Sequence, residues 1–152
     1  MTRKTAREIA MHLTFELAFS NLKVDQLLER ELTEEAFAAR GQEEELYAQY
    51  PNQGIKEYIV TLVRGVADHG AELDGYIERH AKGWRFSRID RVAAAVMRVT
   101  MYEILYMPDV PNKVAINEAV EIAKKYLDED VVRFVNGILG AFVREEFPQT
   151  QE

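Results

Sequence analysis

Residues of the types that perform catalysis or bind metals are few in this chain, and their spacing suits neither task. The three histidines are His12, His69 and His80, and cysteine is absent. His69 and His80 lie about three helical turns apart, too far to share a metal ion. Ser20 and Ser87 are the candidate serine nucleophiles, and neither stands in a nucleophile elbow. No phosphate-binding glycine loop occurs either. The sequence therefore predicts no enzyme, no metal and no cofactor.

The chemistry that the sequence does offer is phosphate binding near its beginning. Arg3, Lys4 and Arg7 stand against Glu8, so the first eight residues carry three positive charges and one negative charge. Basic side chains pair with phosphates, and arginine also stacks on bases. Cations at a helix N-terminus oppose the helix dipole, so a ligand explains them better than helix stability does. A frayed, solvated chain end is the alternative explanation.

The negative charge of the chain is concentrated in another segment. The formal net charge is −7, and between Asp25 and Glu45 eight acids stand against Arg30 and Arg40, which gives that segment a charge of −6. The overall charge therefore says little about whether the first residues bind nucleic acid. A solvated acidic face is the ordinary explanation for such a segment.

Apolar residues recur with helical period, and no stretch alternates for long enough to indicate a strand. The expected helices cover roughly residues 5–19, 24–37, 55–81, 88–106, 113–127 and 131–143. They predict an all-α bundle of about six to seven helices in one domain spanning residues 1–152. Three glycines interrupt 55–81, but its apolar stripe stays in phase across them and predicts one long helix.

Several residues carry signals for helix ends and helix packing. Ser87 and Asn112 are the expected N-caps of the helices that follow them. The acids at 128–130 suit a helix N-terminus. Gly137 and Gly140 each cost about 1 kcal/mol in a helix interior, and we expect them to permit close approach of another backbone.

Three motifs give the chain a family resemblance. Residues 110–124 read VPNKVAINEAVEIAK, and FVNG follows at 134–137. An arginine-rich start lies at 3–8, and Arg98 precedes the pair Tyr102-Glu103. In type and order, these motifs closely resemble the NusB family of transcription antitermination factors over essentially the whole chain.

The resemblance implies two small helical subdomains packed together, and binding of the single-stranded boxA element of leader RNA. Phe15 and Phe134 would offer rings on which unstacked bases stack. Some positions have a structural explanation as well: Phe134 belongs to an apolar stripe, and Asp130 suits a helix start. Lys113 could cover a helix start, and Asn136 could bind a neighbouring backbone. The RNA-contacting positions implied are Arg3, Lys4, Arg7, Phe15, Lys113, Asp130, Arg133, Phe134 and Asn136.

The second implied partner is a small-subunit ribosomal protein, NusE. The assembly would act within the transcription elongation complex and promote read-through during ribosomal RNA synthesis. NusE would dock along the helix expected at 88–106 and its neighbour. The family commonly carries an acid where this chain has Ala93, so the corresponding charge pair is either missing here or supplied by Asp90, one turn away. The candidate partner contacts are Asp90, Val96, Met97 and Met101.

Two other functions stay open at this level. The fold also resembles the N-terminal module of ribosomal RNA cytosine methyltransferases, so the chain could be an RNA-binding module associated with ribosomal RNA modification. It could equally be a helical protein-interaction module without an RNA role.

A composition of 47% hydrophobic and 30% charged residues, with no signal peptide or membrane-length apolar run, predicts a cytoplasmic protein. Both a monomer and a homodimer are compatible with the sequence.

Overall fold

The computed structural model describes residues 1–83 and 88–148, and within these ranges the regular structure is entirely helical. The prediction of an all-α fold is therefore confirmed. The chain divides into two compact units, Met1–Asp68 and His69–Glu152. The two subdomains that the resemblance implied correspond in number to these units. Each unit has its own buried apolar residues and is described by itself.

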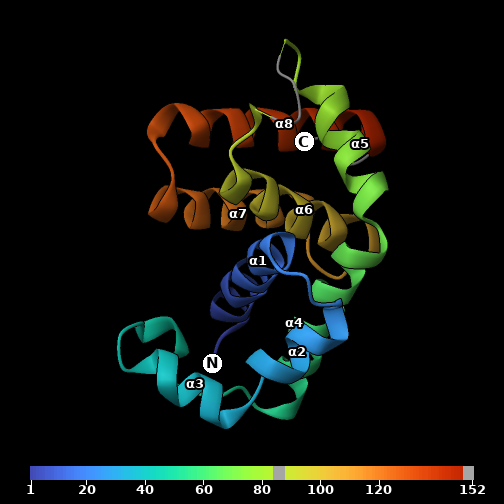
Figure 1. The fold of residues 1–152 in the computed structure, drawn as a ribbon. Helices are drawn as coiled ribbons and strands as arrows, with labels where there is room; N and C mark the ends of the chain where they lie inside the picture. Colours follow the sequence, from blue (N-terminus) through green and yellow to red (C-terminus); the bar gives the residue numbers. More distant parts are fainter. Residues whose placement is uncertain (84–87, 149–152) are drawn as a thin grey trace. The chain divides into compact units, whose positions relative to one another are not determined.

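The first unit is built on the pairing of its first and last helices (Figure 1). It contains α1 (Arg3–Phe19), α2 (Val24–Glu31), α3 (Glu34–Gly41), the 3-10 turn η1 (Glu45–Tyr47) and α4 (Gln53–Asp68). Helix α1 packs along α4, and α2 contacts both. Apolar periodicity predicts a core row for α1, of which Ala6, Ile9, Ala10 and Leu13 are buried and Leu17 is half-buried. Amphipathic periodicity therefore placed the inner face of α1 correctly.

The single helix expected around 24–37 is in fact two helices. Leu32 leaves helical geometry, and Thr33 caps α3 by accepting a hydrogen bond from the Ala36 backbone N–H at 3.1 Å. Glu34 and Glu35 occupy the first turn of α3, where the helix dipole favours negative charge. Thr33 followed by two acids was a readable start signal, and the prediction of one helix was wrong.

Gly41 allows the end of α3 to lie against η1. A Cβ at this position would stand 2.8 Å from the carbonyl oxygen of Tyr47 and 3.3 Å from the Cα of Ala48. Any larger residue would push the two backbones apart. This close approach packs η1, which carries the buried Tyr47, against α3.

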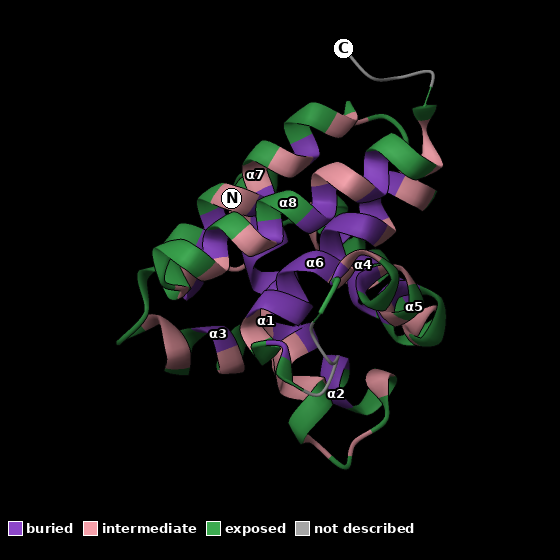
Figure 2. Ribbon diagram, turned by 90° about the horizontal axis from the view of Figure 1, so that it is seen from above, coloured by how far each residue is buried: buried purple, intermediate pink, exposed green. Residues whose placement is uncertain are grey.

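The second unit is organised around one buried helix. It contains α5 (Gly70–His80), α6 (Arg91–Tyr106), α7 (Asn112–Tyr126) and α8 (Glu129–Glu146). Helix α6 contacts all three of the others, and Figure 2 shows it coloured as buried along most of its length. A helix that is apolar around most of its circumference is expected at the centre of a bundle. Helices α7 and α8 form an antiparallel pair joined by a short turn (Figure 1).

The long helix expected at 55–81 is also two helices. Helix α4 ends at Asp68 and α5 begins at Gly70, because the backbone of His69 leaves helical geometry at φ −110° and ψ 19°. The apolar stripe continues in phase because one non-helical residue barely shifts it. Periodicity alone therefore could not reveal the break, and the prediction of one helix was wrong.

Two of the expected helix caps need correction. The N-cap of α6 is Asp90, whose carboxylate accepts hydrogen bonds from the backbone N–H groups of Val92 at 2.8 Å and Ala93 at 3.1 Å. The expected cap, Ser87, lies outside the described residues. Helix α7 begins at Asn112 itself with Pro111 as its N-cap, so Asn112 is not the cap. Proline suits this boundary, because its fixed φ is compatible with a helix start and the N–H groups there have no partner within the helix.

The glycines of α8 do not serve the purpose expected of them. Among the described residues, no atom beyond the helix lies within 4 Å of a Cβ built on Gly137, and the nearest atom to one on Gly140 is the Nη1 of Arg144, at 3.2 Å. Neither glycine touches another backbone, so that prediction was wrong. The acids at the start of α8 are as expected, with Asp128 at the N-cap and Glu129 in the first turn.

Two features are absent from the residues that the structure describes. No helix among them is long and apolar enough to cross a membrane. In the same residues, no three or more histidine and carboxylate side chains are grouped so that they could hold a metal ion.

Candidate nucleic-acid interface

The first turn of α1 presents two exposed cations. Thr2 caps the helix, with the backbone N–H of Thr5 donating to its hydroxyl at 3.1 Å. Arg3 and Lys4 follow and are exposed, and the first turn of this fully described helix contains no acid. The guanidinium of Arg3 lies 4.4 Å from the centre of the Tyr58 ring on α4. This cation–π contact holds one positive charge at the helix start in a defined position.

Arg7 has a different environment from the other two cations. Its side chain is on the inner side of the helix start, and the residue is 5% exposed, like the neighbouring Glu8 at 4%. A buried guanidinium is stable only when its charge is paired and its donors are satisfied. Little of Arg7 is therefore available to a ligand in this structure.

Two aromatic residues follow one another along the outer side of α1. The rings of Phe15 and Phe19 lie 4.9 Å apart with an interplanar angle of 53°. Phe15 is half-buried, whereas Phe19 is 58% exposed. Met11, one turn before Phe15 on the same helix, is buried. Phe15 thus has a ring at the surface where a base could stack.

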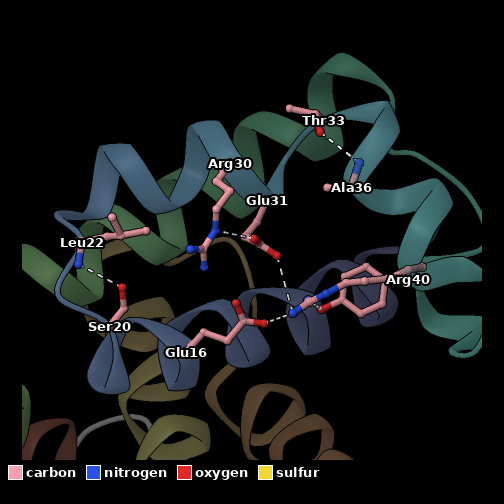
Figure 3. A network of polar contacts seen from close by, with 9 residues as sticks. Glu16, Ser20, Leu22, Arg30, Glu31, Thr33, Ala36 and Arg40 are labelled. Carbon is pink, nitrogen blue, oxygen red and sulfur yellow. Dashed lines mark hydrogen bonds and ion pairs between the residues drawn. The ribbon is translucent and has the colours of Figure 1, made fainter.

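A polar network centred on Arg40 attaches α3 and η1 to α1 (Figure 3). The guanidinium of Arg40 donates to Glu16 on α1, lies 3.5 Å from Glu31 on α2, and donates to the Tyr47 hydroxyl at 2.8 Å. One partly buried arginine therefore joins four segments of the unit. In the sequence, Arg40 stands out only as one of two bases in an acidic segment. Because its partners are distant in the sequence, no local signal could have revealed them.

His12 and Tyr47 continue this network beneath α1. The Nδ1 of His12 lies 3.0 Å from the Tyr47 hydroxyl, and their ring centres are 5.8 Å apart. Burial lowers the pKa of His12, more than the nearby Glu44 and Glu8 raise it. Burial also raises the pKa of Tyr47, so its hydroxyl stays protonated at neutral pH. The network thus contains an uncharged histidine next to an arginine.

In the second unit, two predicted RNA contacts line one pocket. Asp130 and Phe134, one turn apart on α8, border a cavity of about 220 Å³. Phe134 is half-buried there, so part of its ring faces the cavity, and Asp90 lies in the same wall. The structure therefore brings together a predicted RNA-stacking ring and two carboxylates. The remaining lining residues are Arg88, Ile89 and Val131.

The other predicted RNA contacts of this unit are exposed. Arg133 and Asn136 border a shallow depression between α7 and α8, and Arg133 lies 3.4 Å from Glu129 as an exposed ion pair. Such exposed pairs contribute little stability and open readily to a competing anion. Lys113 is exposed in the first turn of α7.

Three of the four predicted partner contacts do not lie on the surface. Val96, Met97 and Met101 on α6 are 2%, 0% and 0% exposed. The reason is the apolar circumference of α6, which places these side chains in the core. That part of the prediction is therefore corrected, because a docking protein could not touch them. Asp90 is exposed and is engaged as the N-cap of α6.

The predicted RNA residues thus divide between the two units. Arg3, Lys4, Arg7 and Phe15 belong to Met1–Asp68, and the remaining five belong to His69–Glu152. Each unit offers a ring together with cations, and this combination suits an unstacked strand of nucleic acid more than a small substrate.

Comparisons with known proteins agree on one family. The NusB family profile matches residues 4–144. A transcription antitermination protein NusB from Ruminiclostridium cellulolyticum is 36% identical over 149 residues, which cover 98% of this chain and 93% of that protein. The protein of the same name from Acetivibrio thermocellus is 39% identical over 144 residues, covering 95% of this chain and 90% of that protein.

Solved structures show the same fold. NusB of T. maritima superposes with a TM-score of 0.80 at 29% sequence identity, covering 95% of this chain and 92% of that one. A crystal structure of the antitermination factors NusB and NusE in complex with double-stranded RNA gives a TM-score of 0.76 at 24% identity, covering 94% and 96%. At that identity the second likeness shows the fold alone.

Proposed function

The chain belongs to the NusB family, and on that premise we propose that it is a transcription antitermination factor that binds boxA-like single-stranded leader RNA together with NusE. The observation that carries the RNA-binding part is the start of α1. There Arg3 and Lys4 are exposed, and Arg3 is held against Tyr58, in a unit whose other surface charges are mostly acidic.

On the first unit, Arg3 and Lys4 contact phosphates of the RNA. Phe15 receives an unstacked base on its exposed side. Arg7 supports the start of α1 and does not contact a phosphate directly, because only a small fraction of it is exposed. This arrangement places charge at one end of α1 and a ring about 17 Å further along the helix.

On the second unit, the pocket beside Phe134 receives a base. Its ring gives a stacking surface, and the carboxylate of Asp130 accepts a hydrogen bond from an exocyclic amine, as acidic side chains do from cytosine. Lys113 and Arg133 contact the phosphates on either side, and Asn136 reads a base edge. The ion pair of Arg133 with Glu129 is exposed and offers little resistance to this exchange.

The protein acts as an adaptor rather than as an enzyme, and it does so in the cytoplasm. RNA and NusE bind to it through separate modest interfaces, and each raises the effective concentration of the other. The ternary complex then joins the elongation complex and promotes read-through during ribosomal RNA synthesis. Asp90 contributes its negative charge to the NusE interface. The buried residues of α6 do not contact NusE but form the core on which this interface rests.

The test is fluorescence anisotropy with a labelled boxA-like single-stranded RNA. A scrambled strand and a double-stranded form of the same sequence serve as competitors, each with and without NusE. We expect selective binding of the single strand that NusE tightens. The double variant Arg3→Ala, Lys4→Ala should bind weakly, whereas Arg30→Ala, which removes an exposed cation from the acidic segment, should bind normally.

Two results would overturn the proposal. Equal affinity for the boxA-like and scrambled strands would remove the assigned RNA specificity. Absence of any salt-sensitive RNA binding would favour a protein-interaction module instead, since phosphate contacts make affinity fall as salt rises.

A further inference from the structure

A single carboxylate joins three aromatic side chains at the surface of the second unit. Glu72, in the first turn of α5, accepts a hydrogen bond from the Tyr106 hydroxyl at 2.7 Å. The Nδ1 of His69 lies 3.1 Å from the same oxygen, and the Tyr76 hydroxyl lies 3.5 Å from the other. These contacts hold the Glu72 side chain in one position, although it is well exposed to solvent.

Three rings beside Glu72, those of Tyr106, His69 and Tyr102, pack against one another and form an aromatic platform. The centre of the Tyr106 ring lies 4.4 Å from that of His69 and 5.0 Å from that of Tyr102, with interplanar angles of 33° and 32°. His69 and Tyr102 are 5.7 Å apart. Tyr106 is nevertheless 43% exposed, so the platform lies at the surface. Aromatic faces carry negative electrostatic potential and attract cations.

The charge of Glu72 is not neutralised by a lysine or arginine among the described residues. Other acids of this unit are neutralised by an arginine. Asp74 pairs with Arg98 at 2.6 Å, and Glu145 pairs with Arg79 at 3.2 Å. The groups around Glu72 are two phenols and a histidine, which is charged only when protonated. The hydrogen bond to Glu72 raises the pKa of Tyr106 to about 12, so this phenol remains a neutral donor.

We propose that Glu72, Tyr106, Tyr102 and His69 form a binding site for an arginine side chain of the protein partner. A planar guanidinium stacks on aromatic rings and donates to a carboxylate at the same time, which matches both features of this surface. A nucleic acid does not suit it, because the uncompensated carboxylate repels phosphates. The inference rests on the proposed function, since it assigns a contact for the partner named there.

This site replaces the buried part of the predicted partner surface. Tyr102 and Tyr106 belong to the last turns of α6, the same helix on which Met97 and Met101 lie buried. Tyrosine and arginine are enriched among the residues that contribute most of the binding energy of protein interfaces. An aromatic platform with a fixed carboxylate at its edge is a suitable anchor of this kind.

The first experiment uses a probe that needs no partner. N-acetyl-arginine amide is titrated into the full chain and followed by the NMR signals of the tyrosine and histidine rings, with N-acetyl-norleucine amide as the uncharged control. We expect saturable shifts of the Tyr106, Tyr102 and His69 signals with the arginine compound. They should vanish in Glu72→Gln, which keeps the size and the acceptor oxygen but removes the charge. An unresponsive wild type, or an equal response from Glu72→Gln, would overturn the proposal.

The second experiment measures NusE and RNA binding by calorimetry. Glu72→Gln and Tyr106→Ala should each weaken NusE binding about ten-fold while leaving RNA affinity unchanged. The matched control is Tyr126→Ala, since Tyr126 is similarly exposed, at 41%, on α7. Urea unfolding of each variant confirms that it is folded. Unchanged NusE affinity in Glu72→Gln, or loss of RNA binding instead, would contradict the site.

These outcomes separate the inference from the proposed function. If the wild type binds neither NusE nor RNA, the proposed function fails, and the arginine titration alone decides whether the site exists. If the wild type binds both but Glu72→Gln binds NusE normally, the site fails and the function stands. Dimerisation that depends on Tyr106 would assign the platform to a second copy of the chain and would also overturn the proposal.

Discussion

The guanidinium of Arg3 rests over the ring of Tyr58, at 4.4 Å from its centre, although the two residues belong to the first and last helices of their unit. Tyr58 is itself buried, so the ring is a rigid support. The contact restrains a long side chain that would otherwise move freely at a chain end. It thereby lowers the entropy that Arg3 would lose on binding a phosphate.

Replacing Tyr58 by leucine should weaken RNA binding without removing any charge. Leucine keeps an apolar side chain in the buried position but cannot hold the guanidinium. An exposed cation–π contact contributes about 0.5–1 kcal/mol, so we expect affinity to fall about two- to five-fold. Tyr58→Phe keeps the ring and should bind like the wild type. Equal affinity for the leucine variant in the anisotropy assay would show that the ring does not position Arg3.

Removing the two exposed cations of α1 should change the salt dependence as well as the affinity. Each phosphate neutralised on a single strand contributes about −0.7 to the slope of log K against log salt. The double variant Arg3→Ala, Lys4→Ala should therefore show a slope shallower by about 1.4. The slope is measured over a series of KCl concentrations.

Arg30→Ala is the control for that slope, because Arg30 is equally cationic but lies among acids and pairs with Glu31 at 2.7 Å. It should leave the slope unchanged. A normal slope in the double variant would place the phosphate contacts elsewhere on the chain.

Loss of the Arg40 side chain should destabilise the first unit. Arg40→Met keeps the aliphatic stem but leaves the Tyr47 hydroxyl without its donor and Glu16 without its ion pair. Hydrogen bonds to charged groups contribute about 1.5–3 kcal/mol each. Because Arg40 is partly exposed to solvent, we expect the variant to lose about 2 kcal/mol in its free energy of unfolding. Urea unfolding measures it as a lower midpoint at unchanged slope.

The control is Arg30→Met, which removes an exposed guanidinium that pairs with Glu31 but leaves the contacts of Arg40 in place, and it should cost less than about 1 kcal/mol. If Arg40→Met proved as stable as this control, the contacts of Arg40 in Figure 3 would not hold α3 in place.

The buried His12 should make stability depend on mildly acidic pH. Burial lowers its pKa in the folded protein, whereas in the unfolded chain it titrates near its ordinary value of about 6.5. Below that pH the unfolded state binds the extra proton, so stability is full above about pH 6.5 and falls as the pH drops through it.

Urea unfolding of the wild type at about pH 7.5 and pH 5.5 tests this dependence. His12→Gln retains a polar group for the Tyr47 hydroxyl but cannot be protonated, so it should lose less stability between the two conditions. Identical losses in both proteins would mean that other groups cause the acid sensitivity.

Asp90 should affect both helix stability and partner binding, and two substitutions separate these effects. Asp90→Ala removes the cap of α6 and should cost about 1 kcal/mol, whereas Asp90→Ser keeps a capping oxygen and should be nearly as stable as the wild type. Both lose the charge, so both should bind NusE more weakly in calorimetry. Normal NusE binding by the serine variant would limit Asp90 to capping.

Much of the fold could be predicted from local patterns. The apolar row of α1 and the stripe of α8 place buried residues correctly, because a 3.6-residue period depends only on neighbouring positions. The family motifs are also local, and they led to the family that the comparisons show. Apolar periodicity did not reveal the break at His69, because one non-helical residue leaves the phase of a stripe almost unchanged, whereas the break before α3 was readable only from its capping residue Thr33 and the two acids that follow it.

Contacts between side chains far apart in the sequence required the tertiary structure. The burial of Arg7 does not follow from its residue type, and the supports for Arg3 and Glu72 come from other helices. Whether an arginine is a ligand or a buried structural residue depends on what packs against it. That packing is set by the whole core, because the free energy of burying a charge depends on partners that only folding brings near.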